Sequence, residues 1–187
     1  MNTVAHAVVG LAVLSRQDSH KRTATIVAGA LIPDLAIILF YAWHRIIGTS
    51  EDLIWSIEYF RPTWQAFIDS FNSIPVIAIG LVLCWKIRHG LIWALFASMM
   101  LHCLTDLPVH HDDGHRHFFP FSDWRFVSPI SYWDSNHYGH WFSLFEALLV
   151  SLLCAFLWIR QATPKVWIVG CLIFYLIFWI YAFLVWN

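Results

Sequence analysis

Residues that commonly bind metal ions gather in one segment of this sequence, from His102 to His140. Seven of the eleven histidines and five of the nine aspartates lie in it. Neutral imidazole and carboxylate groups suit Zn²⁺, Mn²⁺ or Fe²⁺. His102 and Asp106 are four residues apart, so on a helix they lie on one face and can bind the same ion. The segment therefore predicts a site for a divalent metal ion.

The chain after Asp106 offers more candidate ligands than one ion needs. Pro108 is expected to end the helix, and these residues follow it: His110, Asp113, His115, Asp134 and His137. So many ligands allow one to three ions, and centres with two ions suit phosphoester hydrolysis. We predict that His110 binds metal. Three other residues are predicted to complete a second ion or to act as acid–base groups: Asp113, His115 and His137.

Further features of the sequence indicate what the site could bind and which other kinds of site and partner are disfavoured. Arg125 is predicted to bind a phosphate or lipid headgroup, with pairing to a structural carboxylate as the alternative. The sequence has no Gly-x-Ser-x-Gly element, which disfavours covalent serine catalysis. Its four cysteines form no Cys-x-x-Cys pair and are interpreted as small buried hydrophobic residues. A net charge of −1 gives no basic field for nucleic acid.

The composition predicts that these groups sit in a membrane. Hydrophobic residues make up 59% of the chain and charged residues 12%, against roughly 45–50% and 25% in soluble domains. Five apolar stretches are candidate membrane helices: Ile26–Trp43, Ile74–Trp85, Leu91–Leu107, Phe142–Ile159 and Val166–Trp186. We predict a single all-α domain over residues 1–187, a polytopic membrane bundle of about five to six helices, with an exterior loop over residues 108–140.

Two segments fit this scheme less simply. Val4–Leu14 is short for a span, so it is either a helix packed against the others or a shallow half-span. The stretch from Ser50 to Asp69 mixes aromatic and charged residues, which is typical of an interfacial helix or a capping loop. Ile74–Trp85 is itself short and must borrow flanking residues to cross.

Basic residues set the expected orientation. If the loop with Arg16, Lys21 and Arg22 is cytoplasmic, alternation places Lys86, Arg88, Arg160 and Lys165 on the same side, seven of the eleven basic residues. The His-rich segment then faces the exterior, or the periplasm in a bacterium.

Ionisable residues within the apolar helices fall at overlapping depths. They are His6, Asp34, His102, Asp106 and Glu146. Such groups are costly in a bilayer, so each needs a partner or a function. Separate roles are the alternatives. His6 could be a hydrogen-bonded histidine at a helix end, and Asp34 could satisfy backbone groups freed by Pro33. Glu146 could pair with Arg125 or with Arg116.

Several short elements occur in an order that resembles a bacterial inner-membrane family of metal-dependent hydrolases. They cover most of residues 1–130: Ala5-His6, the stretch from Gly29 to Leu35, His102 with Asp106, Pro120-Phe121, Trp124-Arg125-Phe126 and Ser128-Pro129-Ile130. The resemblance implies a multi-pass metal-dependent hydrolase in the inner (cytoplasmic) membrane of a bacterium.

Two departures from the family pattern affect its ligands. The family continues Pro-Asp-x-Asp-His, where this chain has Ala36 and Ile37, and Asn72 takes the place of a family histidine. The extra ligands of the His-rich segment are candidate replacements. A fainter likeness runs from His102 to His110. It is similar to the His-x-x-x-Asp-x-x-x-Pro-x-His signature of zinc-dependent phospholipase C and single-strand nucleases, but is two residues shorter.

The sequence thus predicts a membrane-embedded metal-dependent hydrolase of a phosphoester, with a lipid or lipid-linked substrate. The expected cofactor is Zn²⁺, with Mn²⁺ or Fe²⁺ as alternatives, and the expected ligands are His6, Asp34, His102, Asp106 and His110. The alternatives are a metal-ion or proton transporter and a non-catalytic membrane protein that zinc stabilises. A transporter needs access from both faces, and the apolar inner half of the helices favours the enzyme.

Overall fold

The computed structural model describes residues 1–16 and 19–186. Over these residues the regular secondary structure is entirely helical. Five helical segments are long and apolar enough to cross a membrane: His20–Ile46, Pro62–Lys86, Gly90–Val109, Gly139–Arg160 and Lys165–Ala182. The predicted all-α bundle is confirmed for the described residues, and its five apolar helices mark it as a membrane protein.

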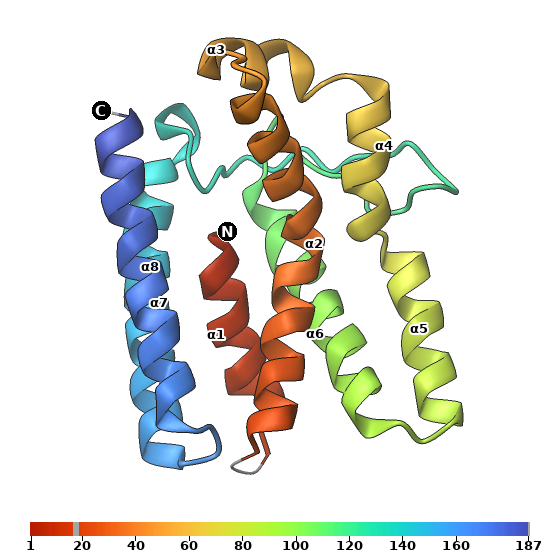
Figure 1. Ribbon diagram of the computed structural model, residues 1–187, viewed down its shortest axis with the longest axis vertical. Coiled ribbons are helices and arrows are strands. Elements are labelled where there is room, and N and C mark those ends of the chain that lie inside the picture. Colours follow the sequence, from red (N-terminus) through yellow and green to blue (C-terminus); the bar gives the residue numbers. More distant parts are fainter. Residues whose placement is uncertain (17–18, 187) are drawn as a thin grey trace.

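The helices run up and down along one long axis (Figure 1). The longer ones are α1 (Thr3–Leu14), α2 (His20–Ile46), α4 (Pro62–Phe71), α5 (Ile74–Lys86), α6 (Gly90–Asp106), α7 (Gly139–Arg160) and α8 (Lys165–Trp186). Short helical turns lie in the connections: α3 (Glu51–Leu53), the π-helical η1 (Ile54–Glu58), and, in the long loop between α6 and α7, the 3-10 turns η2 (Leu107–Val109) and η3 (Ser135–His137). Four of the five predicted apolar stretches fall inside one of these helices, and Leu91–Leu107 runs one residue past α6 into η2.

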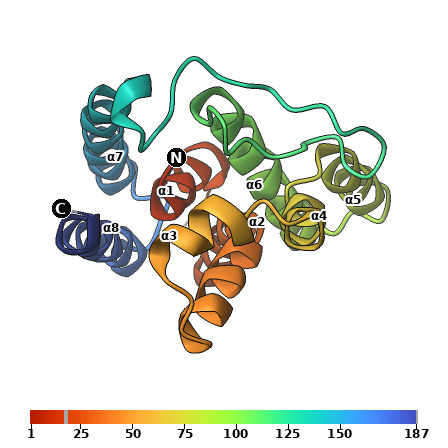
Figure 2. The same cartoon turned by 90° about the horizontal axis from the view of Figure 1, so that it is seen from above.

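The short first helix is a packed central element rather than a half-span at the surface. α1 lies between α7 and α8 on one side and α2 and α6 on the other (Figure 2), and it contacts all four. Its Ala5, Val8 and Leu11 are fully buried. Because α1 starts within the bundle, the residues of its first turns reach the interior level where α2 and α6 present their polar groups.

Small residues bring α1, α2 and α6 into close contact below that level. A Cβ atom on Gly29 of α2 would lie 2.3 Å from the Leu95 carbonyl oxygen of α6, and one on Gly10 of α1 would lie 2.8 Å from Ser98 Oγ. Ser98 Oγ also donates a hydrogen bond to the Ile26 carbonyl at 2.7 Å. Close backbone approach and such interhelical bonds are the main forces that hold helices together in lipid. This contact fixes the rotation of α6 against α2.

The two ends of the bundle differ in character (Figure 1). The α1–α2, α5–α6 and α7–α8 connections lie at one end, with the basic residues Arg16, Lys21, Arg22, Lys86, Arg88, Arg160 and Lys165 in or beside them. The His-rich loop lies at the opposite end. The expected grouping of loops is therefore present, and which end faces the cytoplasm stays a prediction.

The segment 50–69 forms α3, η1 and most of α4, at the same end as the His-rich loop (Figure 1). α4 and α5 together make one span, interrupted at Asn72. The Asn72 amide donates to the carbonyls of Pro33 and Ile68, both at 3.2 Å. Ser73 Oγ then donates to the Phe119 carbonyl at 2.5 Å. The Asn72 bonds fix the break between α4 and α5 against α2, and the Ser73 bond holds the His-rich loop over it.

Candidate metal centre

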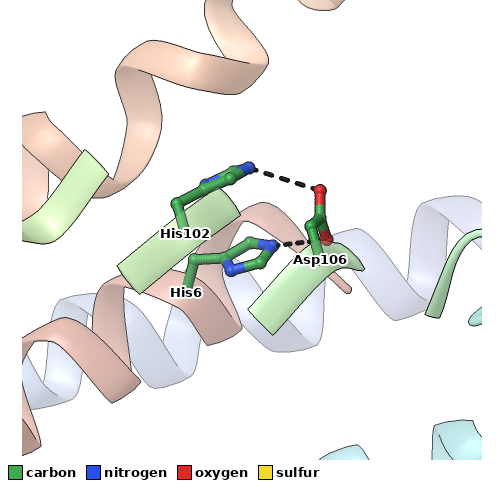
Figure 3. A group of neighbouring side chains, drawn as sticks. All are labelled: His6, His102 and Asp106. Atoms are coloured by element: carbon green, nitrogen blue, oxygen red, sulfur yellow. Dashed lines mark hydrogen bonds and ion pairs between the residues drawn. The ribbon is translucent and has the colours of Figure 1, made fainter. Parts of the chain in front are cut away.

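The carboxylate of Asp106, at the end of α6, is the centre of the polar cluster. Its Oδ1 lies 2.9 Å from His6 Nε2, and its Oδ2 lies 3.4 Å from His102 Nε2 and 3.2 Å from His110 Nε2. All four residues are buried. The rings of His6 and His102 stack with centroids 3.7 Å apart, so both present Nε2 to the same carboxylate (Figure 3).

The ring of His102 is held by the backbone of α2. Its Nδ1 lies 2.7 Å from the Ala30 carbonyl oxygen, which can only accept, so Nδ1 carries the proton. One turn earlier, Ser98 bonds to Ile26 in the same way, and the pair sets the register of α6 on α2. In its neutral form His102 therefore presents the Nε2 lone pair to two carboxylates, Asp106 and, at 3.5 Å, Asp34.

The ring of His6 is oriented by Thr105. Thr105 Oγ1 donates its only proton toward the backbone carbonyls of Leu101 and His102, at 2.8 and 3.1 Å. The 2.9 Å contact between Thr105 Oγ1 and His6 Nδ1 must then be donated by His6. The neutral ring of His6, like that of His102, turns a lone pair toward Asp106. A ring held by its Nδ1 proton with Nε2 free is the usual state of a metal-binding histidine.

A second donor group lies on the loop side of Asp106. His110 Nδ1 lies 3.0 Å from Asp113 Oδ2, and Trp133 Nε1 donates to the same Asp113 oxygen at 2.9 Å. His115 packs beside His110, with ring centroids 5.4 Å apart. Asp113 thus holds the ring of His110 from behind, while His110 Nε2 faces Asp106.

Burial and neighbouring charges give these loop residues different pKa values and therefore different protonation states. Burial lowers the pKa of His110, but Asp106 and Asp113 raise it more, to about 9. Burial and the neighbouring His110 lower the pKa of His115 to about 4. Burial raises the pKa of Asp113, yet His110 and Trp133 outweigh it and bring that pKa to about 2. At neutral pH and without metal, the loop therefore holds His110 charged and His115 neutral.

The donor atoms are close enough for one ion or two. One group is His6, His102 and Asp106, and the other is Asp106, His110 and His115, and in each the ligand atoms lie within 4.8 Å of one another. Buried ring nitrogens in the described residues support this fit. His102 Nε2 and both nitrogens of His110 lie at ion-pair distance from carboxylates but make no hydrogen bond of good geometry with them. Both groups can hold a metal ion, and Asp106 belongs to both.

The structure separates the predicted ligands into three sets. His6, His102, Asp106, His110 and His115 fall within the two groups. Asp34 stands beside His102, and its side chain faces that ring rather than the backbone freed by Pro33. Glu146 belongs to neither group. It accepts from the Asn2 backbone N–H at 2.8 Å and from the Tyr175 hydroxyl at 3.1 Å. The alternative that pairs Glu146 with Arg125 or Arg116 is therefore wrong.

His137 lies apart from Asp106. Its Nδ1 contacts Asp134 at 2.6 Å, and its ring stacks on His111 with centroids 3.6 Å apart. This outer cluster, defined as His111, Asp134 and His137, is partly exposed. The acid–base role proposed for His137 stays a prediction, as does the one for Asp113.

Arg125 ties the loop to α4. It donates to the Gly114 carbonyl and, at 2.6 Å, to Gln65 Oε1, and it lies 3.7 Å from Asp69. Asp69 is fully buried and also binds Arg116 Nε at 2.5 Å. The side chain of Arg125 is 30% exposed, so binding of a phosphate would compete with these structural contacts. That role also stays a prediction.

Sequence reasoning missed the groups that orient the ligands. The Ala30 carbonyl is a backbone group, so no side-chain type marks it. Thr105 sits between two candidate ligands in sequence, and its spacing of three from His102 is the one signal that could have placed it beside the site. Asp69 lies outside the His-rich segment.

The chain was compared with models of protein families, with curated proteins and with solved structures, and none of them matches it. The geometry of the site is therefore the basis for its functional assignment.

Proposed function

We propose that this protein is a membrane-embedded, metal-dependent hydrolase of a phosphoester, with a lipid or lipid-linked substrate. The observation that carries the proposal is the shared carboxylate. Asp106 lies at hydrogen-bonding distance from histidines on both sides, in a buried site with further ligands. A carboxylate between two ligand groups suits a pair of metal ions, and such pairs are common in phosphoester hydrolysis.

The residues of the site would have different roles in this reaction. His6, His102, Asp106 and His110 would hold one or two ions, with Zn²⁺ expected from the nitrogen and oxygen ligands and Mn²⁺ or Fe²⁺ as alternatives. Bound metal supplies a water of lowered pKa and stabilises negative charge on phosphoryl oxygens. His115 would be neutral at pH 7, because its pKa is about 4, so a ring nitrogen would be available to hold a second ion together with Asp106 and His110.

Transport of a metal ion or a proton is supported less well than hydrolysis. The helix segments between the site and the basic end are residues 7–14, 23–33, 91–101, 147–159 and 166–178, and their sequences contain no Asp, Glu, Lys, Arg or His. A permeation path for a metal ion or proton would need polar groups there. We place the site toward the exterior, or the periplasm of a bacterium, because the basic loops are expected to be cytoplasmic.

One experiment tests the proposal. The protein is purified in detergent, its bound metals are measured, and cleavage of a water-soluble phosphodiester is assayed with added Zn²⁺, Mn²⁺ or Fe²⁺. Wild type should hold stoichiometric metal and show metal-dependent cleavage, and His102→Ala and Asp106→Ala should lose both. Wild type without stoichiometric metal would overturn the metal site. Metal without metal-dependent cleavage would overturn the hydrolase and leave a structural or transport role.

A further inference from the structure

An apolar groove begins beside the Asp106 site and runs down the bundle between α6 and α7. It has a volume of about 390 Å³, within the range of small-ligand pockets. Its floor is formed by Met1, just before α1, and by Val9, Ala12 and Val13 of α1. Its walls come from Leu104, Thr105, Pro108 and Val109 on one side and Phe142, Phe145, Leu149 and Leu153 of α7 on the other.

The packing of the helices explains why the groove exists. α6 packs on α1, α2 and α5, and α7 packs on α1 and α8. α1 therefore separates α6 from α7 and is too short to fill the space between them. Figure 2 shows α6 and α7 standing apart with α1 between them. Val13, Leu104 and Phe145 are each more than half exposed, so the groove opens sideways, toward the lipid around the bundle.

The groove is continuous with the candidate metal centre. Thr105 lines the groove and also accepts the hydrogen bond from His6 Nδ1. Met1 lines it too, and its amino group lies 2.6 Å from Asp106 Oδ1. Val109 lines it one residue before His110. A molecule in the groove thus has one end at the metal-binding residues and the rest among apolar side chains.

We propose that this groove holds an acyl chain of the substrate, with the phosphoester at Asp106. The substrate class is then a phospholipid or another phosphoester that carries a long apolar chain, and this assignment rests on the proposed function. The helical part of the floor, from the start of α1 at Thr3 to Val13, is about 15 Å long at 1.5 Å per residue, and Met1 extends it toward Asp106. That length suits an extended chain lying along α1.

The bilayer supplies such chains directly. Thr105 alone among the lining residues carries a polar side chain, and its hydroxyl is already bonded to His6 and to α6 carbonyls. A polar ligand would find no free partner along these walls, whereas an acyl chain needs none. The chain would enter sideways between α6 and α7, while the charged headgroup stays at the polar end.

The test fills the groove and compares two substrates. Ala12→Phe adds a ring to the floor, and Leu149→Trp enlarges the wall from α7. Ala42→Phe, at an exposed position of α2 outside the groove, is the matched control. For each protein, kcat/KM is measured for a long-chain phosphodiester lipid in mixed micelles and for a soluble phosphodiester without a chain. The kcat/KM for the long-chain lipid divided by that for the soluble substrate should fall at least tenfold in the two groove variants. In Ala42→Phe this ratio should stay at the wild-type value.

A second measurement keeps the two proposals distinguishable. Wild type in nanodiscs is labelled with a phospholipid whose acyl chain carries a photoactivatable group, and the labelled residues are mapped. Labelling should concentrate on Leu104, Phe145 and Leu149 and be lost in Ala12→Phe. An even distribution over the lipid-facing helices, or an unchanged substrate ratio in both groove variants, would overturn the acyl-chain assignment. Failure to cleave either substrate would overturn the hydrolase, and the labelling would still decide the groove.

Discussion

Two histidine clusters of this protein use the same residue types in opposite ways. In the Asp106 site His6 stacks on His102, and in the outer cluster His111 stacks on His137, with ring centroids 3.7 and 3.6 Å apart. In the Asp106 site the carboxylate faces Nε2 and other groups take Nδ1. In the outer cluster the Asp134 carboxylate takes Nδ1 of His137.

Burial separates the clusters further. The side chains of His6 and His102 are fully buried, whereas that of His137 is 34% exposed. A buried lone pair turned toward a carboxylate is unfavourable unless a cation or a proton lies between them. A half-exposed histidine paired with an aspartate is satisfied as it stands. The comparison indicates that the atom a carboxylate faces, together with depth, distinguishes a metal site from a simple ion pair.

The largest expected difference is between the two aspartates. Asp106→Asn should lower metal affinity by more than about 100-fold, beyond the effect of residues that only orient ligands, because it removes a carboxylate common to both groups. Asp134→Asn makes the same chemical change in the outer cluster and should leave metal content unchanged. Metal content after chelator competition checks both. Equal losses in the two variants would contradict the distinction drawn between the clusters.

The sequence predicted the fold because its main determinants are local. Apolar runs mark the spans, and all but one have the length that a bilayer needs; Ile74–Trp85 reaches it only together with α4. The spacing of His102 and Asp106 is likewise local, since both lie on α6. The depth of His6 and Asp34 along their helices predicted that both belong to the site, and the structure places both beside His102.

Partners far apart in the chain were not predictable in the same way. Glu146 shares the depth of the ligands, yet it bonds to Asn2 and Tyr175 because α7 packs on α1 and α8 rather than beside Asp106. Helix rotation decides that outcome, and depth alone does not give it. The outer cluster shows the same limit, since Asp134 and His137 are three residues apart and His102 and Asp106 four, and both spacings are compatible with a shared ion.

The next effect concerns a residue that orients a ligand. Asp113→Asn should lower metal affinity by about 10- to 100-fold, because Asp113 holds His110 through Nδ1. Titration with a metal-sensitive chelator measures the change. If Asp113 instead acts only as an acid–base group, the variant would keep wild-type affinity and lose activity alone.

Metal affinity at the Asp106 site should also depend on pH. The pKa of His110 is about 9, so below that pH metal must displace a proton from the ring. Affinity should rise by about tenfold per pH unit for each proton released, from pH 6 toward pH 9. Chelator competition at several pH values gives the slope, and His110→Gln should reduce it. An affinity independent of pH would contradict binding through His110.

The smallest effect is expected at the outer cluster. His137→Gln removes a half-exposed ring whose contacts are the Asp134 pair and the stack on His111. Exposed ion pairs contribute little to stability, so the free energy of unfolding should change little, and metal content should not change at all. Thermal unfolding in detergent and metal analysis test this, with His102→Gln as the buried counterpart. A loss of metal in His137→Gln equal to that in His102→Gln would show that the outer cluster belongs to the metal centre, because removing a ring that binds no ion cannot release one.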